Sequence, residues 1–231
     1  MAGYTELPVF KCEMCGLCCK MSPISLLPHE VVVLEWLANK MNVKLEYAHG
    51  YIVYDALSGV NLAFSYVMQL NNGQCPFLEG NKCRVHNIYK PYICRSFPYI
   101  PKHVKYHIDD VNKYVMATTE YGLSLACNVV KKHKEILEKY WFRNNESPDK
   151  ILQHYFKEGY LAAIEGDNIR SLLLTLLSKL WRDGLADIRQ ANHNAPVVNL
   201  YEYLRRFYPD LPNILGIDKI THRVRACLKT Y

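Results

Sequence analysis

The stretch Lys11-Cys12-Glu13-Met14-Cys15-Gly16-Leu17-Cys18-Cys19-Lys20 holds four cysteines within eight residues, in the pattern C-x2-C-x2-C-C. A spacing of two residues lets successive thiolates turn back onto one metal centre, and it recurs in zinc sites and in iron–sulfur sites. Gly16 gives the backbone freedom where such a loop has to curl around an ion. The stretch therefore predicts cysteine ligation of a metal.

The adjacent cysteines Cys18 and Cys19 indicate two neighbouring sites. In extended backbone, the side chains of neighbouring residues point to opposite sides, so these two thiolates are expected to serve different metals. Cys227 lies on the apolar face of a predicted last helix and is interpreted as a small buried hydrophobic residue. Eight cysteines remain, which is enough for two four-ligand sites. The predicted metal ligands are Cys12, Cys15, Cys18, Cys19, Cys75, Cys83, Cys94 and Cys127.

Two kinds of metal fit these ligands. Closed four-cysteine zinc sites would hold the loops together without redox chemistry. A C-x2-C-x2-C run with a distant fourth cysteine resembles the ligation of a [4Fe–4S] cluster, and a Cys-Pro step is present at Cys75-Pro76. We favour an iron–sulfur cluster as the cofactor, with zinc as the alternative. His86 could replace a thiolate. Basic residues flank the cysteines and could offset the thiolate charge: Lys11, Lys20, Lys82, Arg84, Lys90 and Arg95.

Composition limits the class of protein. The chain has 231 residues, of which half are hydrophobic and 22% charged, which is typical of a globular protein. No run approaches the roughly 18 apolar residues of a membrane span, and the first residues lack the pattern of a secretory signal. We expect a cytoplasmic protein without a membrane partner. Nine cysteines then favour metal ligation over disulfides. Disulfides stay open as an alternative, because some intracellular proteins of hyperthermophiles are rich in them.

Charge is unevenly distributed along the chain. The formal net charge is +6; residues 1–128 hold 11 basic and 10 acidic residues, and residues 129–231 hold 17 and 12. A basic excess on helices is typical of a solvated face and also suits a nucleic-acid partner. A protein partner is the other interpretation.

The first half of the chain predicts a mixture of helix and strand. A helix is expected over about residues 28–40, with His29 on its surface. Residues 44–70 are rich in β-formers and predict a small antiparallel sheet with a turn at Ser58-Gly59. A further strand is expected over 111–119, and a turn with a short helix over 121–127.

Beyond residue 128 the pattern predicts helices. One is expected over 131–142, and Ser147-Pro148-Asp149 caps a second whose apolar stripe reaches Leu161. Asp167 is expected to cap a long helix whose apolar face extends to Leu185 and Ile188. Asn199 predicts the start of a helix over 200–208. The last amphipathic helix would carry Ile220, Val224, Cys227 and Leu228.

With these residues assembled, the chain resembles the YkgJ-type cysteine-cluster family, whose members are described as zinc- or iron-chelating. The resemblance rests on Cys12-x2-Cys15-x2-Cys18-Cys19, on Cys75-Pro76-Phe77-Leu78, and on Cys83 leading through Lys90-Pro91 to Cys94-Arg95-Ser96-Phe97-Pro98. The chain has one residue more between Cys83 and Lys90 than the family pattern. The resemblance covers about residues 12–127 and implies metal chelation. A related flagellin lysine N-methylase has such a motif and is thought to use an iron–sulfur cluster.

Together these features predict an α+β protein with two domains. Residues 1–128 would form a metal-held domain with a small antiparallel sheet and short helices, and residues 129–231 an α-helical domain. The function we expect is metal binding, with a redox or protein-modifying role; the alternative is a non-enzymatic zinc module whose helical half binds nucleic acid or protein. An iron–sulfur oxidoreductase or a lysine N-methylase-like enzyme would fit the first hypothesis. A methylase would need to bind S-adenosylmethionine. The chain lacks the glycine-rich turn between a strand and a helix that is typical of such binding sites. We assign no catalytic residue, since Asp109-Asp110 and Asp183 with Asp187 are ordinary carboxylate pairs.

Overall fold

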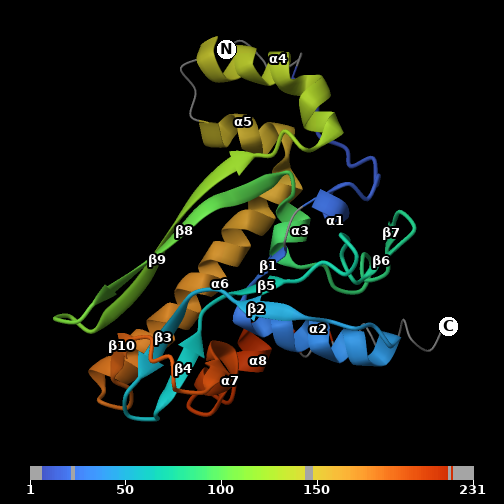
Figure 1. Cartoon of the computed structure of the whole chain (residues 1–231). Helices are drawn as coiled ribbons and strands as arrows, with labels where there is room; N and C mark the ends of the chain where they lie inside the picture. Colours follow the sequence, from blue (N-terminus) through green and yellow to red (C-terminus); the bar gives the residue numbers. More distant parts are fainter. Residues whose placement is uncertain (1–6, 22–23, 144–147, 218–219, 221–231) are drawn as a thin grey trace.

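Helix α2 (Pro28–Met41) confirms the first predicted helix. The computed structural model describes residues 7–21, 24–143, 148–217 and 220 (Figure 1). Pro28 fits the first turn because its missing N–H is not needed there, and Asn42 ends the helix with φ of 52°.

The prediction that His29 lies on the surface is wrong. Its side chain is 2% exposed, because the first turn of α2 faces the ring of Tyr92, 6.1 Å away between ring centroids.

The predicted sheet from residues 44–70 forms, but it is divided between two sheets. Strand β3 (Ile52–Asp55) pairs antiparallel with β4 (Val60–Ala63) across the predicted turn, where Gly59 has φ of 71°. Strand β5 (Tyr66–Met68) lies between β1 (Ile24–Leu26) and β2 (Tyr47–His49), antiparallel to both. The antiparallel α+β character predicted for this half is therefore confirmed.

Two strands that the sequence did not predict complete the second sheet. Strand β10 (Ile188–Gln190) pairs antiparallel with β3, and β11 (Val197–Asn199) pairs parallel with β4. The expectation that the chain is helical throughout after residue 128 is wrong at these positions. Three-residue strands carry almost no local signal, and they form here because the edges of β3 and β4 offer unpaired backbone groups. The predicted boundary between residues 128 and 129 stays a prediction, although strand pairing crosses it.

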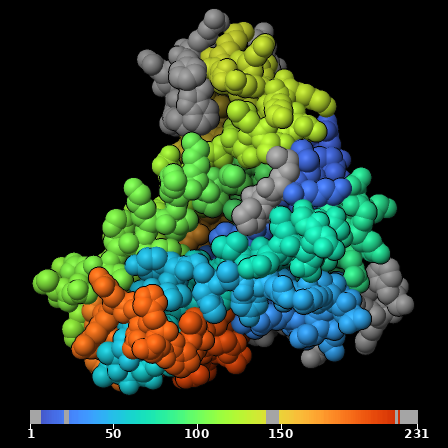
Figure 2. Space-filling view, in the orientation of Figure 1, coloured from blue at the N-terminus to red at the C-terminus, as the bar shows by residue number. Residues whose placement is uncertain are grey.

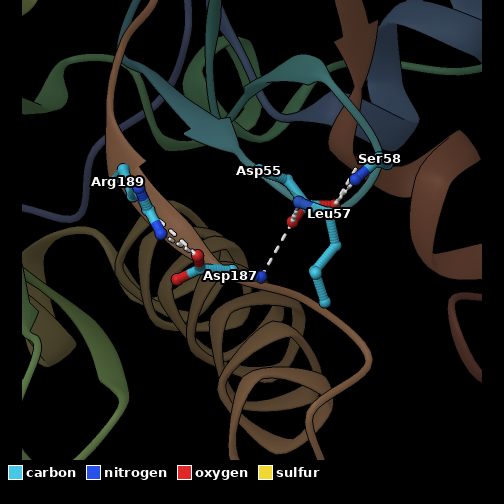
Figure 3. Close-up of polar contacts among 5 residues, drawn as sticks. All are labelled: Asp55, Leu57, Ser58, Asp187 and Arg189. Atoms are coloured by element: carbon cyan, nitrogen blue, oxygen red, sulfur yellow. Dashed lines mark hydrogen bonds and ion pairs between the residues drawn. The ribbon is translucent and has the colours of Figure 1, made fainter.

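Asp55 holds the end of β3 against the segment before β10 (Figure 3). Its fully buried carboxylate accepts hydrogen bonds from the backbone N–H groups of Leu57, Ser58 and Asp187 at 3.2, 3.3 and 2.8 Å. It also accepts from the Ser58 hydroxyl and from the hydroxyl of Tyr203. All five donors are protein groups, so Asp55 has a structural role.

A long antiparallel hairpin of β8 (Tyr99–Asp109) and β9 (Tyr114–Leu123) extends along one side of the molecule (Figure 1). The strand predicted over 111–119 overlaps β9. The short helix expected over 121–127 is wrong, because β9 continues to Leu123 in register with Tyr99. Asp109 closes the hairpin turn by accepting from the N–H groups of Val111 and Asn112 at 3.0 and 2.9 Å.

The helices after residue 128 differ from the prediction mainly at their ends. Helix α4 (Asn128–Arg143) confirms the helix over 131–142. The predicted stripe from Ser147 to Leu161 is broken at Phe156, so that α5 (Pro148–Tyr155) and α6 (Lys157–Arg182) are separate and Leu161 is 52% exposed. Asp167 lies inside α6 rather than at its start. Leu185 and Ile188 lie beyond its end, since Gly184 follows with φ of 73°.

Helix α6 packs against β9 and against helix α3 (Tyr92–Ser96), and it supplies much of the largest core cluster. Helix α7 (Leu200–Arg205) begins where predicted, with the Asn199 side chain accepting from the N–H of Tyr201 and Glu202. Helix α8 (Leu211–Ile214) follows. The predicted last helix carries Cys227 and, apart from Ile220, lies outside the described residues. Ser147 also lies outside them.

Four short elements are grouped to one side of α2 (Figure 1). They are α1 (Cys18–Met21), β6 (Leu78–Glu79), β7 (Lys82–Cys83) and α3 (Tyr92–Ser96), and they carry Cys18, Cys19, Cys83 and Cys94. Among the helices in the described ranges, none has both the length and the apolar character to cross a membrane.

Candidate metal centre

The cysteine run turns at Gly16 and then forms the single turn of α1. Gly16 has φ of 71°, as its predicted role in a tight loop requires, and its carbonyl accepts the N–H of Cys19 at 3.0 Å. A Cβ at this position would lie 3.4 Å from the backbone of Asn81. The loop between β6 and β7 thus packs closely against the cysteine run.

Cys18 and Cys19 lie in helical rather than extended backbone, and their Sγ atoms are 3.9 Å apart. The premise that their side chains point to opposite sides is therefore wrong. Two thiolates bound to one tetrahedral zinc at 2.3 Å would be about 3.8 Å apart. The observed separation suits two ligands of one metal.

Three further cysteines converge on this pair. The N–H of Cys75 donates to the carbonyl of Cys19 at 2.7 Å, which ties the second cysteine segment to α1. The β6–β7 hairpin returns the chain so that Cys83 pairs in register with Leu78, whose N–H donates to the carbonyl of Cys75 at 2.9 Å. Cys94 lies on α3. One core cluster, built around α2, includes or contacts four of these cysteines: Cys19, Cys75, Cys83 and Cys94.

Five of the thiols lie near enough to one another to shift one another's pKa. Burial raises the pKa of Cys75 to about 11 and the pKa of Cys83 and Cys94 as well. The charge of Cys18 raises each of these three pKa values further. A hydrogen bond between the two sulfurs lowers the pKa of Cys18 to about 6 and raises that of Cys19. A bound metal cation would replace the protons and stabilise all of these groups as thiolates.

Lys90 is the predicted basic residue that acts on this site. Its charge lowers the pKa of Cys18, Cys83 and Cys94. Other flanking cations have different partners: Lys20 donates to Asn81 at 3.1 Å, and Arg95 pairs with Glu165 at 3.0 Å while lying over the ring of Tyr92. Lys90 is therefore placed to offset thiolate charge.

The remaining predicted ligands, Cys12, Cys15 and Cys127, have different surroundings. Cys12 and Cys15 are exposed. Cys127 packs beside α4 against a core cluster that includes Leu7 and Tyr155. An ion pair of 2.8 Å between Glu13 and Lys132 ties the start of the cysteine run to α4. The structure thus brings together Cys18, Cys19, Cys75, Cys83 and Cys94, and the eight-ligand assignment stays a prediction.

The donor set fits a soft or borderline metal, since it consists of thiols in a partly buried site. All eight described cysteines are free thiols. Within the part of the chain that the structure describes, no three His, Cys, Asp or Glu side chains are arranged as a ready metal site. The five thiols are thus near enough to shift one another's pKa, and metal binding would draw them closer.

Sequence reasoning missed a group of buried polar residues next to this site. Glu30 and His29 of α2 are 1% and 2% exposed, and Arg170 of α6 is also largely buried. The carboxylate of Glu30 accepts from the N–H of Leu27 at 2.8 Å and from that of Tyr92 at 2.7 Å. An acidic residue three positions after a helix start is a capping signal that could have identified the first of these bonds.

Comparison with known proteins supports the cysteine motif. Residues 11–120 match a family model named CxxCxxCC and described as "Putative zinc- or iron-chelating domain". Seven of the eight predicted ligands fall in this range, and Cys127 lies beyond it. No curated protein and no solved structure shows significant similarity to the chain. Residues 11–120, a little under half of the chain, are thus similar to the domains that this family model describes.

Proposed function

We propose that Cys18, Cys19, Cys75, Cys83 and Cys94 supply the ligands of a thiolate metal centre that holds an iron–sulfur cluster. The observation that carries this proposal is the 3.9 Å pair of Cys18 and Cys19 beside three further thiols. In a [2Fe–2S] cluster, four cysteine thiolates bind two irons, so two sulfurs share each iron. A pair at this separation fits one such iron.

The cluster would serve a redox or protein-modifying role in a cytoplasmic protein. Lys90 would raise its reduction potential by offsetting negative charge. The free thiols agree with a reducing compartment. The basic segment after residue 128 would direct this activity to a protein partner.

A zinc centre is the second candidate, and the same sulfur separation favours it because it matches a tetrahedral zinc site. The protein would then be a zinc-stabilised module whose basic helices bind nucleic acid or protein. Zinc is colourless and inert to reduction, so the two candidates differ in measurable ways.

The test is the content of iron, zinc and acid-labile sulfide per chain, measured on protein purified without oxygen. We expect iron with matching sulfide in the wild type and its loss in the double variant Cys75→Ser/Cys94→Ser, because only three of the five thiols then remain and the cluster needs four. Cys227→Ser is the control, because Cys227 is not among the predicted ligands, and it should retain the metal. Zinc without sulfide would establish the second candidate, and a protein that binds neither metal would refute both.

The same measurement tests the predicted two-centre arrangement. If Cys12, Cys15 and Cys127 bind a second metal, Cys12→Ser and Cys127→Ser will each remove about half of the metal, whereas Cys227→Ser will remove none. One centre built from the five converging thiols predicts that all three variants keep the full content.

A further inference from the structure

The break between α5 and α6 leaves a groove that is open to solvent. Each helix turns one face toward it, because the residues that line the groove follow helical spacing in both: Lys150, Gln153 and His154 of α5, and Lys157, Tyr160, Leu161 and Ile164 of α6. The groove has a volume of about 500 Å³, within the range of roughly 300–1,000 Å³ that is usual for binding pockets. Figure 2 shows α4 (yellow-green) protruding at one end of the molecule, and α5 lies beside α4 at that end (Figure 1).

The α6 side of the groove is mainly apolar and exposed. Leu161 is 52% exposed and Ile164 is 40% exposed, although both are large hydrocarbon side chains. They lie three positions apart on one helix, so they form one continuous patch with Tyr160. Single exposed apolar residues are common, whereas an apolar patch beside polar groups is typical of an interaction site.

The aromatic residue of this patch is held in place by the β8–β9 hairpin. The ring of Tyr160 stacks on that of Tyr99 with 6.0 Å between ring centroids, and Tyr99 stacks on Tyr121 at 4.7 Å. A side chain that is already ordered loses little conformational entropy when a partner binds, and tyrosine is enriched among the residues that dominate binding energy. Tyr160 is therefore a prepared contact.

Positive charge lies beside the apolar patch. Lys150 and Lys157 are exposed, and neither forms an ion pair with another residue in the described part of the chain. By contrast, Lys132 and Lys134 of α4 each form one. Among the described residues, no aspartate or glutamate lines the groove. An occupant with negative groups would thus find two lysines available for pairing.

We propose that the groove between α5 and α6 binds an acidic amphipathic helix of a partner protein. Apolar side chains on one face of that helix would pack on Tyr160, Leu161 and Ile164, and carboxylates beside them would pair with Lys150 and Lys157. A third helix suits a groove lined by two, because the side-chain ridges of one helix pack between those of its neighbours. A nucleic acid suits it less, since aliphatic side chains offer neither a charge for phosphates nor a ring on which bases stack.

This inference rests on the proposed function in one respect, namely that the segment after residue 128 binds a protein partner. It adds the surface and the chemistry of that partner. No cysteine of the described ranges lines the groove, so peptide binding and metal content can be measured separately on the same preparation. Failure of one measurement leaves the other intact.

The test is fluorescence anisotropy of the full chain with a labelled helical peptide, designed with leucines at i, i+3 and i+7 and with glutamates beside them. Two further probes are the same peptide with lysine in place of every glutamate, and a single-stranded oligonucleotide of similar length. We expect saturable binding of the acidic peptide with a Kd on the order of micromolar. The other two probes should bind at least about tenfold more weakly.

A double charge reversal tests the basic part of the groove. Lys150→Glu/Lys157→Glu should weaken binding of the acidic peptide about tenfold or more and strengthen binding of the lysine peptide. Both positions are exposed and near helix starts, where glutamate is tolerated. Lys105→Glu/Lys179→Glu is the matched control. It changes the net charge equally at exposed positions outside the groove, and should bind the acidic peptide like the wild type.

A second variant tests the apolar part without changing any charge. Leu161→Ala/Ile164→Ala should weaken binding of the acidic peptide about tenfold or more. The unfolding temperature should stay close to that of the wild type, because both side chains are exposed and alanine favours the helix. The proposal is overturned if the acidic peptide does not bind to the wild type, if the lysine peptide or the oligonucleotide binds as tightly, or if both folded groove variants bind the acidic peptide unchanged.

Discussion

Glu30 is a carboxyl group whose surroundings favour its neutral form. It is fully buried, and burial raises its pKa from 4.5 to about 7 against the opposing effect of the backbone N–H groups of Leu27 and Tyr92. The surroundings of the preceding residue, His29, also favour its neutral form, because burial lowers the pKa of its imidazole to about 3. Two neighbouring residues on α2 thus link folding to pH with opposite signs.

The pH dependence of Glu30 can be isolated by Glu30→Gln. The folded state keeps the Glu30 proton up to about pH 7, whereas the unfolded chain releases it near pH 4.5, so the contribution of Glu30 to stability is lost as pH rises through this interval. The loss amounts to about 3 kcal/mol. Urea unfolding between pH 4.5 and 8 should show the variant gaining stability relative to the wild type as pH rises. His29 is present in both proteins and cancels in the difference; parallel profiles would contradict the assignment.

At the scale of the elements, short strands are held by side chains from distant parts of the chain. Strand β10 has three residues, and its pairing with β3 is reinforced where Asp55 accepts the N–H of Asp187 and the hydroxyl of Tyr203 of α7. Close by, Arg189 and Asp187 form a mostly exposed ion pair with a separation of 2.6 Å (Figure 3). The backbone N–H of Asp187 contacts the Asp55 carboxylate, whereas the Asp187 carboxylate points toward Arg189, and the two carboxylates differ in burial.

Asp55→Asn and Asp187→Asn therefore form a matched pair of variants. Asp55→Asn places an amide NH2 among buried donors and should lower the free energy of unfolding by about 3 kcal/mol. Asp187→Asn weakens an exposed pair and should cost less than about 1 kcal/mol. Urea denaturation measures both values. Equal effects of the two substitutions would contradict the structural role of Asp55.

For the molecule as a whole, the two halves of the sequence share one core. Leu62 and Phe64 of the first half pack in the same cluster as Leu177 and Trp181 of α6 and Leu204 of α7. Strands β10 and β11 pair with β3 and β4 across the predicted boundary. The segment that matches the family model is thus packed on helices that lie outside the matched range.

A fragment of residues 1–128 tests the predicted domain boundary. We expect this fragment to lack a cooperative thermal transition, because removing α6 and α7 exposes the apolar face of the β3–β4 sheet and of β9. Circular dichroism of the fragment, loaded with iron or zinc, is the measurement. A cooperative transition with native-like helix content would establish residues 1–128 as an independent domain.

Much of the local structure could be predicted from the sequence. The helical spacing of apolar residues in α2, the Asn199 cap of α7 and the turn at Gly59 depend on residues within a few positions of one another. The β8–β9 hairpin was only partly predicted, although Val104, Tyr106 and Ile108 alternate in the manner of a strand. Strands as short as β10 and β11 have no such pattern.

The sequence by itself determined the chemistry of the candidate site, because soft thiol donors at two-residue spacing are a property of residue type and local order. Only the tertiary structure decided which cysteines meet, since Cys75, Cys83 and Cys94 reach Cys18 and Cys19 through the β6–β7 hairpin and the packing of α3. It also decided the burial of Glu30 and Arg170 around one cavity. These features depend on contacts between segments far apart in the chain, and no local pattern specifies such contacts.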